Sequence, residues 1–150
     1  MQDRPPELNR APAHLWAIGV IGLLWNSFGC LDYTMTKLDP VAYMTSVGMG
    51  AEEIAYTQML PGWLSAFWAL GVWGSLAGSV LLLVRSRHAV AAFAVSLIGL
   101  AVSQVYQYLD PTLPASMHSP GMVAMMVLIW GALLFFIGYA RVMARRGVLR

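Results

Sequence analysis

Charged residues are scarce in this chain of 150 residues, because Asp, Glu, Lys and Arg together make up 11% of it while 59% is hydrophobic. A soluble domain carries roughly 25% charged residues. This scarcity excludes an ordinary water-soluble domain. The net charge is only +2, and the basic residues gather at a few boundaries in the sequence. That distribution points to membrane topology and excludes a nucleic-acid-binding surface.

Cysteine and catalytic motifs are equally scarce. Cys30 is the single cysteine, so no intrachain disulfide can form. The sequence has no nucleophile and base at a recognisable spacing, no paired-carboxylate site and no phosphate-binding glycine loop. His14, His88 and His118 fall at the boundaries of apolar segments, which fits interfacial placement better than metal or haem ligation. We therefore expect no enzymatic activity, no cofactor and no bound metal.

Four long apolar runs are what the sequence does contain, at about residues 15–36, 62–84, 89–109 and 121–141. Each reaches the roughly 20 residues that a helix needs to cross a bilayer. The pattern predicts an all-α membrane four-helix bundle in a single domain, with tails at 1–14 and 142–150 and a loop at 37–61. A secretory signal peptide is the alternative interpretation of the first run, but that run is longer than the roughly 7 to 15 residues of a signal core.

The distribution of Lys and Arg predicts the orientation of the bundle. The two tails, Arg141 at the end of the fourth run and the connection at 85–88 account for every Lys and Arg except Lys37. We expect both termini in the cytoplasm and two in–out–in hairpins, with the 37–61 loop outside. Within that loop, Ala51 to Leu60 fits a short amphipathic helix with Ile54 and Met59 turned towards the membrane surface.

Small residues recur at helical spacing in all four runs and predict the faces on which the helices pack. Such spacing lets membrane helices approach closely, although it does not say whether the neighbour belongs to the same chain. In the first run, Asn26 and Tyr33 continue the same inward-facing seam. The predicted packing glycines are Gly19, Gly22, Gly29, Gly71, Gly74, Gly78, Gly99 and Gly131.

The two halves of the chain share short segments. Leu38-Asp39-Pro40 after the first run matches Leu109-Asp110-Pro111 after the third, and residues 72–76 match residues 129–133 around a Trp-Gly pair. These matches fit a parallel internal repeat of the kind that some transporters contain. Because Asp-Pro is a common way to stop a helix, chance similarity is the alternative.

Polar and aromatic residues gather towards the outer ends of the first three runs, together with Trp63 and Ser65. Amides, a carboxylate, phenols and indoles at one level suit a vestibule for a small polar solute. Asn26 fits equally well a hydrogen bond across a helix interface, and the tyrosines fit an ordinary aromatic belt. The candidate substrate-binding residues are Asn26, Asp32, Tyr33, Trp68, Gln104, Tyr106 and Gln107.

Several segments between residues 14 and 108 carry a family resemblance: the start His14-Leu15-Trp16, Leu24-Trp25-Asn26 followed by residues 32–36, residues 53–56, Pro61-x-Trp63, and the run from Trp73 to Arg85. In these segments the chain resembles a group of small four-span bacterial inner-membrane proteins that are often labelled sugar transporters. The resemblance implies a place in the bacterial inner membrane and suggests a sugar-like solute.

Two functions follow from these observations. The first is transport or binding of a small polar, sugar-like solute, by an oligomer because four helices alone enclose little volume. The second is a non-catalytic accessory or scaffold role, in which the glycine-rich seams dock on a larger membrane complex. Both require the lipid bilayer as a partner, and neither involves nucleic acid.

Overall fold

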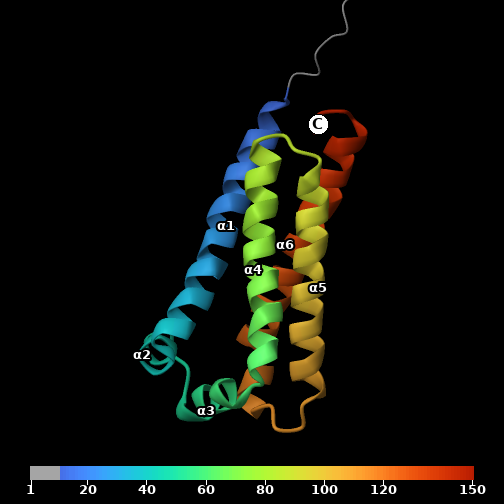
Figure 1. Cartoon of the computed structure of the whole chain (residues 1–150). Coiled ribbons are helices and arrows are strands. Elements are labelled where there is room, and N and C mark those ends of the chain that lie inside the picture. The colour runs from blue at the N-terminus through green and yellow to red at the C-terminus, as the bar shows by residue number, and fades with distance from the viewer. Residues whose placement is uncertain (1–10) are drawn as a thin grey trace, which may run out of the picture.

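The computed structural model describes residues 11–150, which are helical apart from short connections (Figure 1). Four helices are long and apolar enough to cross a membrane: α1 (Ala13–Leu38), α4 (Gly62–Leu83), α5 (His88–Leu109) and α6 (Pro120–Arg145). They pack as a bundle, so the predicted all-α membrane four-helix architecture is confirmed. Residues 1–10 of the expected N-terminal tail lie outside the described part of the chain.

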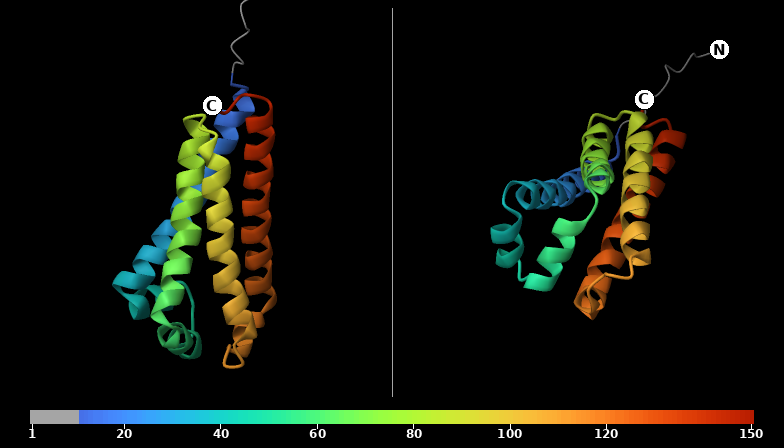
Figure 2. Two further views of the ribbon diagram at one scale, coloured as in Figure 1. Left: turned by 45° about the vertical axis from the view of Figure 1, so that its right-hand side comes forward. Right: turned by 60° about the horizontal axis from the view of Figure 1, so that its bottom comes forward.

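The two ends of the bundle differ in character. α1 begins and α6 ends at the same end, which we call the termini end (Figure 1). The opposite end, which we call the α3 end, carries three short helices: α2 (Pro40–Ser46), α3 (Ala51–Met59) and the 3₁₀ helix η1 (Ala115–His118) (Figure 2). This arrangement agrees with the prediction of two helical hairpins, each of which begins and finishes at the termini end of the bundle.

The segment 37–61, predicted as a loop with one short helix, contains two helices. The Asp39 carboxylate accepts a hydrogen bond from the amide of Ala42 at 3.2 Å, and Pro40 occupies the first position of α2, so the sequence caps a helix there. The predicted helix at 51–60 exists as α3. The prediction that Ile54 points towards the membrane surface is wrong, because this face of α3 packs on the protein and leaves Ile54 only 9% exposed. Met59 is 81% exposed.

α4 and α5 form the closest helix pair, and glycines make that approach possible. A Cβ built on Gly99 would lie 2.5 Å from the backbone nitrogen of Gly71 and 2.5 Å from the carbonyl oxygen of Phe67. A Cβ on Gly74 would lie 3.2 Å from the Cα of Ser96. The neighbour of the α4 seam therefore belongs to the same chain.

α1 packs on the other side of α4 through its own small residues. Gly19, Gly22 and Asn26 are buried, and Gly29 is half-buried against Val72. The amide of Asn26 donates hydrogen bonds to Ser79 Oγ at 2.9 Å and to the Ser75 carbonyl at 3.3 Å. The seam predicted in the first run thus faces α4.

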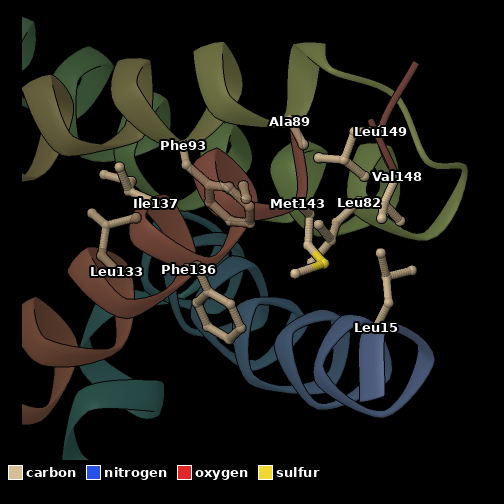
Figure 3. Close-up of a cluster of buried hydrophobic side chains, with 11 residues drawn as sticks. Leu15, Leu82, Ala89, Phe93, Leu133, Phe136, Ile137, Met143, Val148 and Leu149 are labelled. Atoms are coloured by element: carbon tan, nitrogen blue, oxygen red, sulfur yellow. The ribbon is translucent and has the colours of Figure 1, made fainter. Parts of the chain in front are cut away.

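α6 packs tightly only near the termini end. Its buried residues all lie between 133 and 143, where the rings of Phe136 and Phe93 stack at 5.6 Å (Figure 3). Gly131, predicted as a packing glycine, has no atom within 4 Å of the position that a Cβ would take. It therefore packs against no helix within the described residues. This face of α6 is open because this half of the helix diverges from α1 (Figure 2).

The last residues of the chain complete the core, which corrects the prediction of a tail at 142–150. α6 continues to Arg145, and Gly147 then reverses the chain with a φ of 67°. Val148 and Leu149 are 6% and 5% exposed in the core at the termini end (Figure 3). The backbone of Arg150 pairs with the α4–α5 connection, donating to the Arg85 carbonyl at 2.7 Å and accepting from the Arg87 amide at 2.8 Å.

Candidate functional site

An apolar groove with a volume of about 570 Å³ lies between α1 and α6. Ile18 and Ile21 of α1 form one wall, and residues 127–136 of α6, including Gly131, form the other. Every lining residue is apolar. The groove faces the hydrocarbon region of a bilayer and offers no hydrogen-bond partner to a polar solute.

A second, polar pocket lies at the α3 end, where four helices converge. Its volume is about 40 Å³. Lys37 comes from the last turn of α1, and Leu60 and Leu64 supply apolar contacts. The remaining polar and aromatic lining consists of Thr57 of α3, Ser65 and Trp68 of α4, and Ser103 and Gln107 of α5.

Lys37 supplies the positive charge of the polar pocket. Its ammonium donates a hydrogen bond to Ser65 Oγ at 2.6 Å. It also lies 5.9 Å and 5.8 Å from the ring centroids of Tyr33 and Trp68, which contact each other edge to face at 4.9 Å. Aromatic faces attract a cation without neutralising it. Among residues 11–150, no Asp or Glu forms an ion pair with Lys37.

Ser103 brings a hydroxyl group that lacks a partner. The residue is 7% exposed, and its Oγ is the single buried side-chain oxygen or nitrogen in the described residues without a hydrogen bond. Leaving such a group unsatisfied costs about 1 to 3 kcal/mol. Gln107, one turn further along α5, donates its amide to the Ser103 carbonyl at 3.2 Å, and its side-chain oxygen accepts no hydrogen bond from residues 11–150. The pocket therefore holds unused hydrogen-bonding capacity.

The structure brings together some of the candidate solute-binding residues and separates others. Tyr33, Trp68 and Gln107 lie at or beside the polar pocket. Tyr106 contacts the ring of Trp63 at 5.3 Å on the adjoining surface, and Gln104 is half-buried with no side-chain hydrogen bond among residues 11–150. Asp32 accepts a hydrogen bond from the Tyr43 hydroxyl at 2.8 Å.

Asn26 lies apart from this group, since its amide is buried between α1 and α4. Sequence reasoning did not assign Lys37, Thr57 or Ser103 to a site. Lys37 was visible as the single basic residue outside the segments predicted to be cytoplasmic, and Ser103 was visible among the small residues of the third run. The sequence did not show that α3 folds over these residues and covers the pocket.

α3 is tied to the connection between α5 and α6 by two hydrogen bonds. The Tyr56 hydroxyl donates to the Asp110 carboxylate at 3.3 Å, and burial together with the negative charge of Asp110 raises the pKa of Tyr56 to about 12. The hydroxyl and amide of Thr112 lower the pKa of Asp110. A hydrogen bond from Ser116 lowers the pKa of Glu53. These contacts hold α3, which forms the roof of the polar pocket, in place.

The contact between Tyr56 and Asp110 predicts the pH range in which α3 stays docked. The folded pKa of Tyr56 lies above its ordinary value, so its contribution is complete below about pH 10 and is lost as the pH rises towards 12. The folded pKa of Asp110 is lowered, so its contribution is present above about pH 4 and is lost at more acidic pH. We expect the motion of a spin label at position 59 to be restricted by the docked helix near pH 7 and to increase between about pH 10 and 12.

The label requires Met59→Cys in a Cys30→Ser background, and the measurement is electron paramagnetic resonance in lipid nanodiscs. Met59 is largely exposed, so the label does not disturb packing. In Tyr56→Phe, no phenol titrates at this contact, and the change above pH 10 should be absent. An unchanged alkaline transition in that variant would show that another group holds α3.

Among the described residues, no three His, Cys, Asp or Glu side chains lie close enough to hold a metal ion. Comparison of this chain with protein-family models, with curated proteins and with solved structures gives no match. Assignment of the site therefore depends on the chemistry and geometry of its own residues.

Proposed function

We propose that this integral membrane protein binds a small polar solute in the polar pocket, at the outer face of a bacterial inner membrane. The observation that carries the proposal is the convergence of side chains from four helices on a pocket with an unpaired ammonium and an unpartnered buried hydroxyl. The placement of Lys and Arg supports an outward-facing α3 end. The resemblance to proteins labelled sugar transporters supports a sugar-like solute.

The size of the pocket limits what part of the solute enters it. A water molecule needs about 10 to 15 Å³ of such volume, so about 40 Å³ accommodates roughly three non-hydrogen atoms. The body of the solute would then lie outside, against the surface formed by Trp63 and Tyr106, where Trp63 is 50% exposed. Flat aromatic faces suit a sugar ring.

Passage of the solute through a single copy of the chain would require packed helices to separate. Below the pocket, α4 and α5 are in backbone contact at Gly71 and Gly99, and α1 is bonded to α4 through Asn26. We therefore propose binding as the function of the chain itself. Transport would need a rearrangement of α1 or an assembly of several copies.

Binding is tested with the full chain in lipid nanodiscs by ligand-detected NMR titration against neutral and acidic monosaccharides. Ser65→Leu fills the pocket and should abolish binding. Ser27→Leu is the matched control, since Ser27 is exposed on α1 away from the pocket, and it should bind like the natural protein. Absence of binding to every sugar, or equal binding by the two variants, would contradict the proposal.

The apolar groove favours a second function, that of an accessory subunit which receives one helix of a membrane partner. Apart from Gly62 at the start of α4, the glycines of α1, α4 and α5 pack inside the chain, whereas Gly131 in the groove wall and Gly138 on α6 have open Cβ positions. Small residues of this kind let a second helix approach closely. A photoreactive residue at position 131 should cross-link to a partner in native membranes; protein that is always extracted alone would argue against this role.

A further inference from the structure

We infer that the polar pocket recognises a carboxylate, so that the solute is an organic acid, such as a sugar acid, and not a neutral sugar. This inference depends on the proposed solute-binding function and specifies the chemical group that is bound. It follows from three properties of the pocket: its charge, its free donors and its size.

The charge of the pocket is positive and unbalanced. Lys37 is its one charged lining residue, and no carboxylate lines it. The carboxylates of Asp32, Glu53 and Asp110 are hydrogen-bonded to other groups: Asp32 to Tyr43, Glu53 to Ser116, and Asp110 to Tyr56 and Thr112. Lys37 is exposed, and its ammonium has no counter-ion among residues 11–150, so it can attract an anion from solution. Hydrogen bonds between charged partners are stronger than neutral ones.

The free donors match the two oxygens of a carboxylate. An ammonium has three N–H donors, and Lys37 uses one of them on Ser65. The Ser103 hydroxyl is a rotatable donor with no acceptor in the described residues. One carboxylate oxygen would accept from Lys37, and the other would accept from Ser103 after the side chains that cover Ser103 Oγ shift. Leu60 and Leu64 shield the group from water, which strengthens both bonds.

The size of the pocket selects among anions. Its volume of about 40 Å³ suits the three non-hydrogen atoms of a carboxylate. Phosphate and sulfate each have five, and a sugar ring has more. The size of the pocket therefore favours a carboxylate over the larger phosphate of a lipid headgroup.

A matched pair of sugars tests the inference. Glucose and glucuronate share one ring and differ in that a carboxylate replaces the hydroxymethyl group. With the full chain in phosphatidylcholine nanodiscs, we expect glucuronate to bind at least about 10-fold more tightly than glucose, and acetate to compete with it. Lys37→Met keeps the apolar stem, removes the charge and should weaken glucuronate binding by about 10- to 100-fold.

Two further variants separate a binding role from a structural one. Arg141→Met makes the same change in charge at an exposed position near the termini end and should leave binding unchanged. Ser103→Ala should weaken glucuronate binding several-fold while raising the melting temperature of the ligand-free protein, because it removes a buried hydroxyl that has no partner. A Ser103 that acts only in packing would not give these opposite effects.

Each outcome decides a separate question. If glucose and glucuronate bind equally well and Lys37→Met alters neither, the carboxylate inference is overturned while the solute-binding function stands. If glucose, glucuronate and acetate all fail to bind, the proposed function falls as well. Tight glucuronate binding that is lost in Lys37→Met and kept in Arg141→Met supports both.

Discussion

Replacing Gly99 with alanine is expected to make the protein about 2 to 3 kcal/mol less stable than replacing Gly131 with alanine. At Gly99 the new methyl group would lie 2.5 Å from main-chain atoms of Gly71 and Phe67 on α4. Backbone atoms of a packed helix cannot rotate away as a flexible side chain can. The two helices must therefore move apart, and contacts along the whole α4–α5 interface weaken.

Gly131→Ala is the matched control for this experiment. Both glycines lie inside membrane-spanning helices, so both substitutions gain the same roughly 1 kcal/mol of helix propensity, and the difference between them isolates the contact. At Gly131 no atom lies within 4 Å of the added methyl group. The measurement is reversible unfolding by SDS in mixed micelles, followed by circular dichroism. Equal stability of the two variants would mean that α4 and α5 are not in backbone contact.

These two glycines also show how far the sequence determines the fold. In lipid, a long apolar segment has to satisfy its backbone hydrogen bonds internally, so four runs of sufficient length predict four helices. The periodic small residues then predict which face turns inward. Gly74 and Gly131 have nearly the same local sequence, yet Gly74 packs on Ser96 and Gly131 packs on nothing in the described chain. Local pattern does not encode how far a helix diverges from its neighbour.

The candidate site was predictable only in part, for a similar reason. Depth along a helix can be calculated from the rise per residue, which correctly grouped Tyr33, Trp68 and Gln107 near one level. Depth does not reveal which polar groups bond to each other. The side-chain amide of Asn26 donates its hydrogen bonds to Ser75 and Ser79 on α4. α3 covers the pocket and is held there by the hydrogen bond between Tyr56 and Asp110, which lie 54 residues apart in the sequence. No local sequence pattern predicts such a contact.

Removal of residues 148–150 is expected to destabilise the protein by about 3 to 5 kcal/mol, with a fall in melting temperature of about 10 °C. Val148 and Leu149 are almost fully buried beside Leu15, Leu82 and Met143 (Figure 3). Burial of one such aliphatic side chain stabilises a fold by roughly 1.5 to 3 kcal/mol. The exposed arginines at this end, among them Arg87 and Arg146, indicate that water reaches it, so the hydrophobic effect operates there.

The shortened chain also loses support for the α4–α5 connection. Arg85 adopts a φ of 60°, a left-handed conformation that costs a non-glycine residue about 1 to 2 kcal/mol. Its carbonyl accepts from the Arg150 amide, and its Nε donates to the Val148 carbonyl at 3.1 Å. Without these partners the connection between the two most closely packed helices loses main-chain and side-chain bonds at once.

Arg150→Ala in the full-length chain distinguishes this mechanism from a loss of charge. The Arg150 residue is exposed, and its contacts with Arg85 and Arg87 use the main chain, which alanine retains. We therefore expect Arg150→Ala to melt within about 2 °C of the natural protein in nanodiscs, because exposed substitutions change stability by about 0.5 kcal/mol or less. If the shortened chain melted at the same temperature as Arg150→Ala, residues 148 and 149 would contribute no stability, and the end of the chain would be a tail after all.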